Sequence, residues 1–194
     1  MYFQKVKNFI TKPVESFRNE ANVPLNEAFK YLLILGLFNT VMGIIVYVIS
    51  IYLVSLQMFV GASQALTIIS IGYLFFQSYV GIVSGAVLGG AFLHLFAWLL
   101  GARQGIKQTL KSVIYANTPS YVLGWVPGII FITFIWTFVL NIVGLMNLQK
   151  MSTGRAILAV ILPILIALII IIMIIGSVLF ALDVFNPTTF ISTG

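Results

Sequence analysis

The stretch Gly101–Pro119 reads GARQGIKQTLKSVIYANTP and separates two long apolar runs of the chain. Arg103, Lys107 and Lys111 recur in it at every fourth residue, which makes the stretch polar and basic. From Tyr115 onward it leads back into apolar sequence. A basic interruption between two apolar runs is typical of a connection between membrane-spanning helices on the cytoplasmic side.

The composition of the whole chain indicates a protein that lies in lipid. Of its 194 residues, 61% are hydrophobic and 7% are charged, and the mean hydropathy is +1.13. A soluble domain carries about 25% charged residues, so this chain lacks the polar surface that water requires. The net charge of +6 therefore indicates membrane topology and contact with lipid headgroups rather than nucleic-acid binding.

Missing residue types exclude several kinds of chemistry. The chain has no cysteine, which excludes disulfides, thiolate zinc sites and cysteine nucleophiles. One histidine and four acidic residues offer no paired-carboxylate, Ser/His/Asp, HExxH or phosphate-loop arrangement. We therefore predict a non-enzymatic protein without a cofactor or metal, and we expect no cleavable signal peptide.

The apolar runs predict an all-α, polytopic membrane protein with five transmembrane helices. A helix needs about 20 apolar residues to cross the bilayer core. The expected spans are residues 31–56, 75–100, 112–125, 129–148 and 156–182, which together form a domain over residues 31–183. Residues 57–71 carry no charge and predict an outer loop or an interfacial helix.

The positions of the ten cations predict the orientation. With five spans, all of them fall on one side: five before the first span, three between the second and third, and Lys150 and Arg155 between the fourth and fifth. The positive-inside rule makes that side cytoplasmic. We therefore expect an integral protein of the cell membrane with its amino terminus inside and a tail of residues 184–194 outside.

Residues 1–30 predict a cytoplasmic amphipathic segment. Apolar residues such as Phe9 and Phe17 share one side of a helical wheel, and Lys5 and Lys12 share the other. Pro13 suits the first turn of a helix, so we expect two short helices rather than one. Two placements stay open: flat on an anionic membrane surface, or packed as a cap under the bundle.

Glycines predict a close helix contact on the second span. Gly81, Gly85 and Gly89 lie four residues apart and therefore share one helix face. Small residues at this spacing let another backbone approach closely in lipid. We favour a contact within the chain, and a homodimer is the alternative.

His94 is the only ionisable residue within the second predicted span. Such a histidine can relay protons or change its charge near neutral pH. However, no second histidine and no carboxylate at membrane depth completes a relay. We therefore favour a structural histidine that hydrogen-bonds a neighbouring helix.

Two prolines interrupt predicted spans. Pro119 leaves the Tyr115 carbonyl without its helical donor, and the polar neighbour Asn117 can compensate for the break. Pro163 likewise leaves a carbonyl of the fifth span without its helical donor. Asn141, like Asn39, can bond across helices. Broken helices mark substrate sites in some transporters, although no inverted repeat is visible here.

The order of several motifs resembles that of the Yip domain family, the Ypt/Rab-GTPase-interacting membrane proteins, and most closely its short prokaryotic members. The motifs are GAVLGGAFLH (85–94), LGARQG (100–105), YANTP (115–119), Trp136, IVGLMNL (142–148) and MSTGRA (151–156). The resemblance covers about residues 5–182. It implies a five-helix membrane domain with a cytoplasmic amino terminus, and a GTPase partner is implied by the resemblance alone.

We thus expect a scaffold or membrane-organising protein whose cytoplasmic face engages membrane lipids, a second copy of itself or other membrane proteins, and not nucleic acid. The candidate interaction residues are Arg103, Lys107, Lys111, Lys150 and Arg155. The simpler alternative is that these cations only set orientation. The rival function is a small transporter or channel for a lipid or hydrophobic molecule, with a cavity that reaches His94, Asn117 or Asn141.

Overall fold

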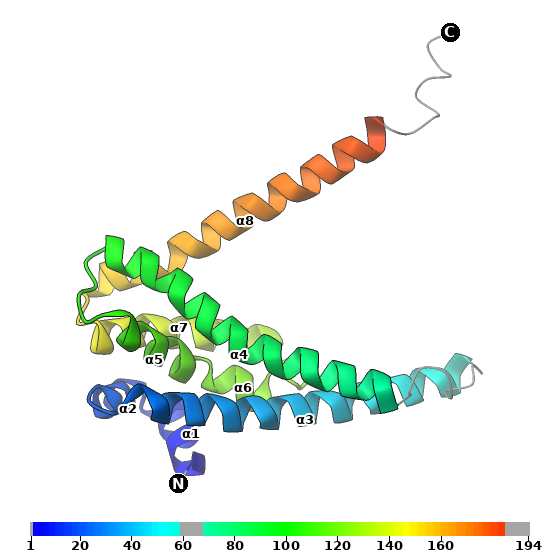
Figure 1. Cartoon of the computed structure of the whole chain (residues 1–194), viewed down its shortest axis with the longest axis horizontal. Helices are drawn as coiled ribbons and strands as arrows, with labels where there is room; N and C mark the ends of the chain where they lie inside the picture. The colour runs from blue at the N-terminus through cyan, green and yellow to red at the C-terminus, as the bar shows by residue number, and fades with distance from the viewer. Residues whose placement is uncertain (1, 59–67, 185–194) are drawn as a thin grey trace. The chain divides into compact units, whose positions relative to one another are not determined.

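The computed structural model describes residues 2–58 and 68–184, and in these ranges every regular element is a helix (Figure 1). The helices are α1 (Tyr2–Thr11), α2 (Pro13–Glu20), α3 (Leu25–Met58), α4 (Ile68–Leu99), α5 (Ile106–Ala116), α6 (Thr118–Leu123), α7 (Ile130–Leu148) and α8 (Thr153–Val184). The predicted all-α class is therefore confirmed. The predicted tail 184–194, apart from Val184, and residues 59–67 of the predicted outer connection lie outside the described residues.

Four helices are long and apolar enough to cross a membrane, by length and composition. They cover Leu25–Leu53, Ser70–Leu99, Ile130–Leu148 and Thr153–Phe180. Many of their apolar side chains are exposed, among them Phe76 on α4 and Phe131 on α7. Such large apolar side chains are stable on the surface of these helices when lipid surrounds them.

The third predicted span, 112–125, is not one helix of span length. Its residues belong to α5 and α6, which are 11 and 6 residues long and meet at Asn117. Pro119 lies in the first turn of α6, where a missing N–H costs no helical hydrogen bond. The proline thus ends one helix and begins another, and does not kink a continuous span.

The chain divides into two compact units, residues 1–160 and 161–194. The described part of the second unit is the continuation of α8, which passes through Pro163 without ending there. Its run of isoleucines and leucines is exposed, as at Leu168 and Ile172. This part of the helix presents an apolar surface on all sides, as expected of a single span in lipid.

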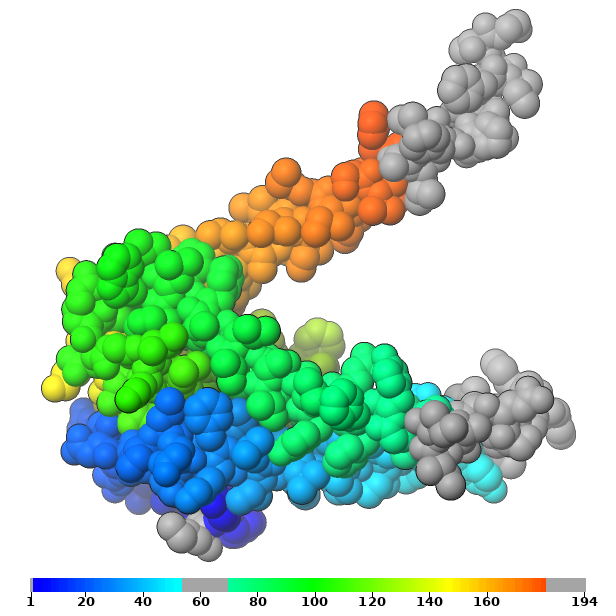
Figure 2. Space-filling model, in the orientation of Figure 1, coloured from blue at the N-terminus to red at the C-terminus, as the bar shows by residue number. Residues whose placement is uncertain are grey.

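The core of the first unit surrounds α5. Eight consecutive residues of this helix, Thr109–Ala116, are buried. It packs against α3, α4 and α7, and α2 packs against α7. Figures 1 and 2 show α3 and α4 running side by side. The short and moderately polar α5 is therefore the centre of the bundle, and the more apolar helices lie outside it.

The two N-terminal helices pack against this core. As predicted, the amphipathic segment is split at Pro13, which is the first residue of α2. Phe9 and Phe17 are fully buried, and the Phe9 ring stacks on Tyr115 at a centroid distance of 4.7 Å. The contacts therefore favour the cap rather than a segment lying flat on lipid.

Close helix contacts occur at different glycines from those predicted. Gly81, Gly85 and Gly89 are exposed, and the described residues place nothing within 4 Å of where a Cβ would stand. The described residues therefore make no close contact at these three glycines, and the predicted helix contact through them stays a prediction. The tight positions are Gly90, which faces Leu110, and Gly144, which faces Ser112 and Phe17. The spacing of the three glycines identified a helix face but not which face meets a neighbour.

Candidate functional site

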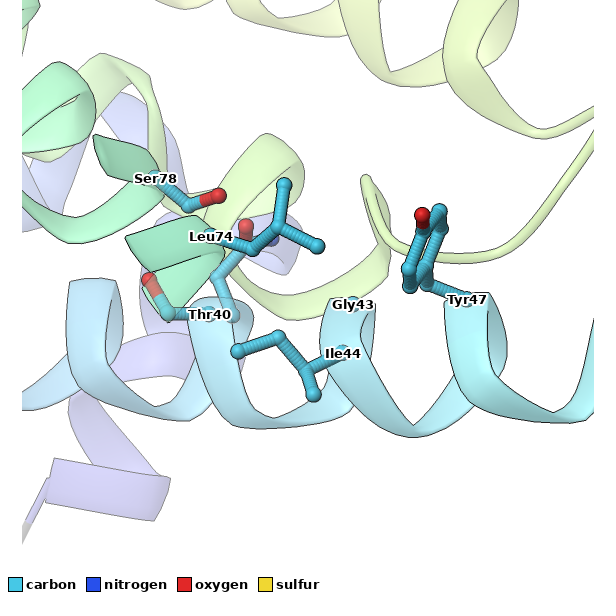
Figure 3. A pocket seen from close by; sticks show the side chains of 7 residues that line it. Thr40, Gly43, Ile44, Tyr47, Leu74 and Ser78 are labelled. Atoms are coloured by element: carbon cyan, nitrogen blue, oxygen red, sulfur yellow. The ribbon is translucent and has the colours of Figure 1, made fainter. Parts of the chain in front are cut away.

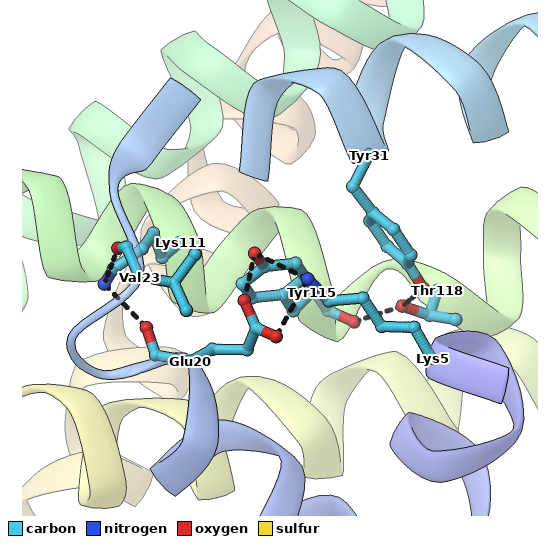
Figure 4. Close-up of polar contacts among 7 residues, drawn as sticks. All are labelled: Lys5, Glu20, Val23, Tyr31, Lys111, Tyr115 and Thr118. Atoms are coloured by element: carbon cyan, nitrogen blue, oxygen red, sulfur yellow. Dashed lines mark hydrogen bonds and ion pairs between the residues drawn. The ribbon is translucent and has the colours of Figure 1, made fainter. Parts of the chain in front are cut away.

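Lys111 holds the end of α2 against α5 (Figure 4). Its ammonium donates to the backbone carbonyls of Glu20 (2.8 Å), Ala21 (2.8 Å) and Val23 (3.0 Å) at and just after the end of the helix, where carbonyls lack helical donors. The Glu20 and Ala21 carbonyls also accept from Val23 N–H and Gln108. The side chain is 2% exposed. Burial lowers the pKa of Lys111, and the Glu20 carboxylate opposes that shift by raising it. Lys111 is therefore not available for the exposed surface in which the sequence placed it.

An ion pair and a hydrogen bond to the same carboxylate join α1, α2 and α5. The Lys5 ammonium lies 2.8 Å from the Glu20 carboxylate, and the Tyr115 hydroxyl donates to the other Glu20 oxygen at 2.6 Å. Lys5 also lies over the Tyr115 ring, 4.7 Å from its centroid. Charge-assisted hydrogen bonds of this length are the stronger kind in proteins. The two N-terminal helices and the distant α5 are thereby joined around one carboxylate.

The break between α5 and α6 is satisfied by its own polar residues. The Thr118 hydroxyl donates to the Tyr115 carbonyl at 2.6 Å, and the Asn117 amide donates to Val113 O at 2.8 Å. Because the Thr118 proton is used there, the Tyr31 hydroxyl donates to Thr118 Oγ1 at 2.9 Å. Thr118, and not Asn117, therefore satisfies the Tyr115 carbonyl that Pro119 leaves without a helical donor. Tyr31 ties the break to α3.

We call Lys5, Glu20, Tyr31, Lys111, Tyr115 and Thr118 the docking cluster. The sequence analysis named Tyr115 and Lys111 as candidates but missed Tyr31 and Glu20, whose carboxylate bonds Tyr115 and whose backbone carbonyl bonds Lys111. Residues 1–30 contain three acids, Glu15, Glu20 and Glu27, and no pattern distinguishes Glu20 from the other two. Nothing in the spacing indicated that it pairs with Tyr115, which lies 95 residues away.

Gln149, which directly follows α7, bonds the connection that precedes α5 and the first turn of α5. Its side-chain amide donates to Gly105 O at 2.7 Å and to Thr109 Oγ1 at 2.8 Å, and its carbonyl oxygen accepts from the Gln104 N–H at 2.9 Å. Arg18 of α2 donates to Asn147 at 3.1 Å. The C-terminal end of α7, the N-terminal end of α5 and the end of α2 therefore lie together.

The predicted cations other than Lys111 are exposed around these connections. Arg103 donates to Trp98 O at 2.6 Å and lies over the Trp98 ring. Arg155 lies against Gly101. Lys107 and Lys150 are exposed as well. Lys150 adopts a positive φ of 54° in the turn between α7 and α8, a conformation rare outside glycine. We call Arg103, Lys107, Lys150 and Arg155 the basic face.

His94 bonds a neighbouring helix, as predicted for a structural histidine. Its Nδ1 lies 2.8 Å from Thr109 Oγ1, which also accepts from Gln149. Asn141, in contrast, donates to Thr137 O of its own helix, and its Oδ1 has no partner among the described residues. Within those residues, no three His, Asp or Glu side chains lie close enough to hold a metal ion.

A polar crevice opens between the apolar helices at Asn39. The Asn39 amide donates to Ser120 O (2.9 Å) and Tyr121 O (3.1 Å) at the end of α6. Asn39 also lines three cavities of about 220, 360 and 290 Å³. Figure 3 shows the first, between α3 and α4, with Thr40, Tyr47 and Ser78 around it. We call these cavities the Asn39 crevice.

The other two cavities extend the crevice toward α6 and α7. Both are lined by Asn117 and Ser120, one with Thr133 and Thr137 and the other with Gly81 and Gly85. The sequence analysis predicts a cavity that reaches His94, Asn117 or Asn141, and the crevice reaches Asn117. Its lining includes neither His94 nor Asn141. No sequence signal marks Thr40, Ser78 and Thr133 as lining residues, because single hydroxyls within apolar helices are common.

Comparisons with known proteins identify a family. The family model of the Yip1 domain matches residues 7–175, which is most of the chain and includes the Asn39 crevice and all of the docking cluster except Lys5. Neither the curated proteins nor the solved structures contain a match. The helical bundle, its apolar spans and this match together show that the chain belongs to the Yip1 domain family.

Proposed function

We propose that this membrane protein is a non-enzymatic, membrane-organising scaffold of the cell membrane that binds anionic lipid headgroups through its cytoplasmic basic face. The observation that carries the proposal is the grouping of Arg103, Lys107, Lys150 and Arg155 at connections that Gln149 holds together. Exposed cations near a membrane surface each contribute about 1 kcal/mol of attraction to anionic lipid.

The proposal includes five crossings with the amino terminus inside and the carboxyl terminus outside. Gln149 at the end of α7 bonds Gly105 at the start of α5, and Ser120 of α6 bonds Thr137 of α7 at 2.9 Å. These contacts support α5 and α6 running together, antiparallel to α7. A crossing by α7 therefore returns the chain to the side of the membrane on which α5 begins. The broken pair then counts as the third crossing, and both basic connections share one side.

Cysteine accessibility tests this topology directly, because the chain has no cysteine of its own. We would introduce single cysteines at Gln104, Pro127 and Ser152 and label intact cells with a membrane-impermeant maleimide. Pro127→Cys should react from outside, whereas Gln104→Cys and Ser152→Cys should react only after the cells are opened. Labelling of Gln104→Cys and Pro127→Cys from the same side would contradict five crossings.

Charge reversal tests the headgroup function. The variant R103E/K107E/K150E/R155E should lose at least tenfold of the anionic lipid that co-purifies from native membranes, because four attractions become repulsions. Lys111 is left unchanged because a buried carboxylate there would unfold the protein. The matched control R103K/K107R/K150R/R155K keeps every charge and should keep the lipid. Equal lipid in both variants would mean that these cations only set orientation.

Protein partners remain part of the same proposal. A GTPase partner is supported by family membership alone, and a second copy of the chain is supported by the four-residue spacing of Gly81, Gly85 and Gly89. Crosslinking in native membranes, with the same charge-reversal variant, distinguishes partners that need the basic face from partners that bind within the membrane.

The second candidate function is a transporter or channel for a lipid or hydrophobic molecule. The observation that favours it is the Asn39 crevice, which reaches Asn117 beside the Pro119 break. Reconstituted vesicles should then move a fluorescent lipid between leaflets faster than vesicles without protein. Equal rates would remove this candidate without affecting the headgroup proposal.

A further inference from the structure

We propose that the Asn39 crevice binds a neutral lipid alcohol, an uncharged lipid of the diacylglycerol type whose free hydroxyl bonds Asn39 and Thr40. This inference concerns a different part of the molecule from the basic face, and it requires binding only, not transport. It rests on polar groups that the fold leaves unused, on their depth, and on the uncharged lining of the cavities.

Several polar atoms in the first cavity have no partner among the described residues. Thr40 is 2% exposed, lines the cavity, and its Oγ1 makes no hydrogen bond there. Asn39 uses its amide N–H groups on Ser120 O and Tyr121 O, which leaves its Oδ1 as an open acceptor. Ser78 and Tyr47 add two hydroxyls at the same cavity (Figure 3). An unpaired buried polar group costs about 1–3 kcal/mol, so a ligand that pairs it gains that amount.

The depth of the crevice makes bulk water an unsuitable partner. Asn39 is the midpoint of the candidate span Leu25–Leu53. At 1.5 Å per residue, this residue lies roughly 21 Å along the helix from either end. Unpaired polar groups at that depth cost several kcal/mol in lipid, because no solvent reaches them. The partner that is abundant at this depth is lipid itself.

The lining of the cavities selects an uncharged hydroxyl. None of the residues that line the three cavities is Asp, Glu, Lys, Arg or His, which disfavours ionic headgroups, free fatty acids and inorganic ions. Asn39 Oδ1 requires a donor, whereas the Thr40 hydroxyl can donate to an acceptor. An ester or ether oxygen only accepts, so it would leave Asn39 Oδ1 unpaired. A free hydroxyl supplies both roles from one atom.

The size of the crevice also fits part of a lipid. Its three cavities measure about 220, 360 and 290 Å³, against roughly 30 Å³ for one water molecule. The walls include Ile44 and Leu74 in the first cavity and Ile130 and Phe134 in the second, which suit acyl chains. A hydroxyl-bearing glycerol group can therefore lie at Asn39 while its chains extend along the apolar helices.

The test uses the full-length protein in nanodiscs and three photoactivatable lipids with identical diazirine acyl chains. These are a diacylglycerol, its methyl ether, which lacks the donor, and a phosphatidylcholine. We expect the diacylglycerol to crosslink to α3 and α4 around Asn39 and to be displaced by unlabelled diacylglycerol. The methyl ether and the phosphatidylcholine should label the same peptides about tenfold less. Equal labelling by all three lipids would overturn the proposal and identify the crevice as a general lipid contact.

Two variants test whether the labelling depends on the hydroxyls of Thr40 and Ser78. T40V/S78A keeps the shape of both side chains approximately and should reduce diacylglycerol labelling about tenfold, because one or two hydrogen bonds of roughly 1 kcal/mol are lost. The control S84A removes a hydroxyl from the same helix, α4, that is already bonded to Val80 O and lies outside the crevice. Unchanged labelling in T40V/S78A would also overturn the proposal. The headgroup test at the basic face does not depend on either result.

Discussion

The docking cluster and the Asn39 crevice are both polar regions within a mainly apolar bundle, but they use their polar atoms differently. In the docking cluster, Lys111 makes three hydrogen bonds, and both oxygens of Glu20 are paired. In the crevice, Thr40 Oγ1 has no partner among the described residues. Polar groups that stabilise a fold are paired within it, whereas groups left unpaired at depth point to a ligand.

The comparison predicts the largest effect at Lys111. The variant Lys111→Met should destabilise the protein by about 3 kcal/mol, because three hydrogen bonds from a buried ammonium are lost and the Val23 carbonyl is left without a donor. The Glu20 and Ala21 carbonyls keep their bonds from Val23 N–H and Gln108. Thermal unfolding of the purified protein measures this. The control Lys107→Met changes an exposed residue and should remain within about 0.5 kcal/mol of the parent. Equal stabilities would show that the cluster does not hold α2.

Packing provides the second test, with one glycine in the core that the N-terminal helices pack against and one in the crevice. Gly144→Ala should destabilise by about 1–3 kcal/mol, because an added Cβ would overlap Ser112 and press on the Phe17 ring. Gly43 lines the first cavity of the crevice and has nothing within 4 Å of its missing Cβ. Gly43→Ala should therefore be neutral or stabilising by up to about 1 kcal/mol, since alanine favours the helix. The reverse order of melting temperatures would contradict the comparison.

The hydroxyl of Tyr115 should have a smaller effect. Tyr115→Phe keeps the stack on Phe9 but removes the hydrogen bond to Glu20, which predicts a loss of about 1.5–2 kcal/mol. Limited proteolysis should then cut α1 and α2 from the bundle sooner. Tyr73→Phe is the matched control, because that side chain is 64% exposed. Identical proteolysis of both variants would show that this bond does not hold the N-terminal helices in place.

The smallest effect on stability is expected in the crevice. T40V/S78A should change stability in lipid-free detergent by less than about 0.5 kcal/mol, since Thr40 Oγ1 has no partner among the described residues and Ser78 is exposed. Thermal unfolding again measures this. A loss of 2 kcal/mol or more would show that the two hydroxyls are structural, and the contrast with the docking cluster would no longer hold.

Much of the fold follows from local patterns in the chain. Four of the five predicted spans correspond to helices that can cross a membrane, and the division of the N-terminal segment at Pro13 is confirmed. The Pro119 break and the structural bond of His94 also follow from local reasoning. These features depend on periodicity, helix-breaking residues and the cost of an unpaired polar group in lipid, all of which act over a few residues.

Other features depend on contacts between distant segments. The sequence placed Lys111 with the exposed cations because its spacing matches Arg103 and Lys107, but the docked α2 buries it. Likewise, the spacing of Gly81, Gly85 and Gly89 predicted a contact that the described residues make at Gly90 and Gly144 instead. Spacing defines a face of a helix, and only the neighbouring helices determine whether that face is covered.

The sequence by itself determined that this chain lies in lipid, where its helices run and where its cations concentrate, because composition and hydropathy act locally. The tertiary structure alone decided which polar groups are paired. Glu20 finds Tyr115 across 95 residues of sequence, while Thr40 finds no partner among the described residues. The reason is physical: whether a buried polar group is satisfied depends on which segments pack beside it, and no local pattern contains that information.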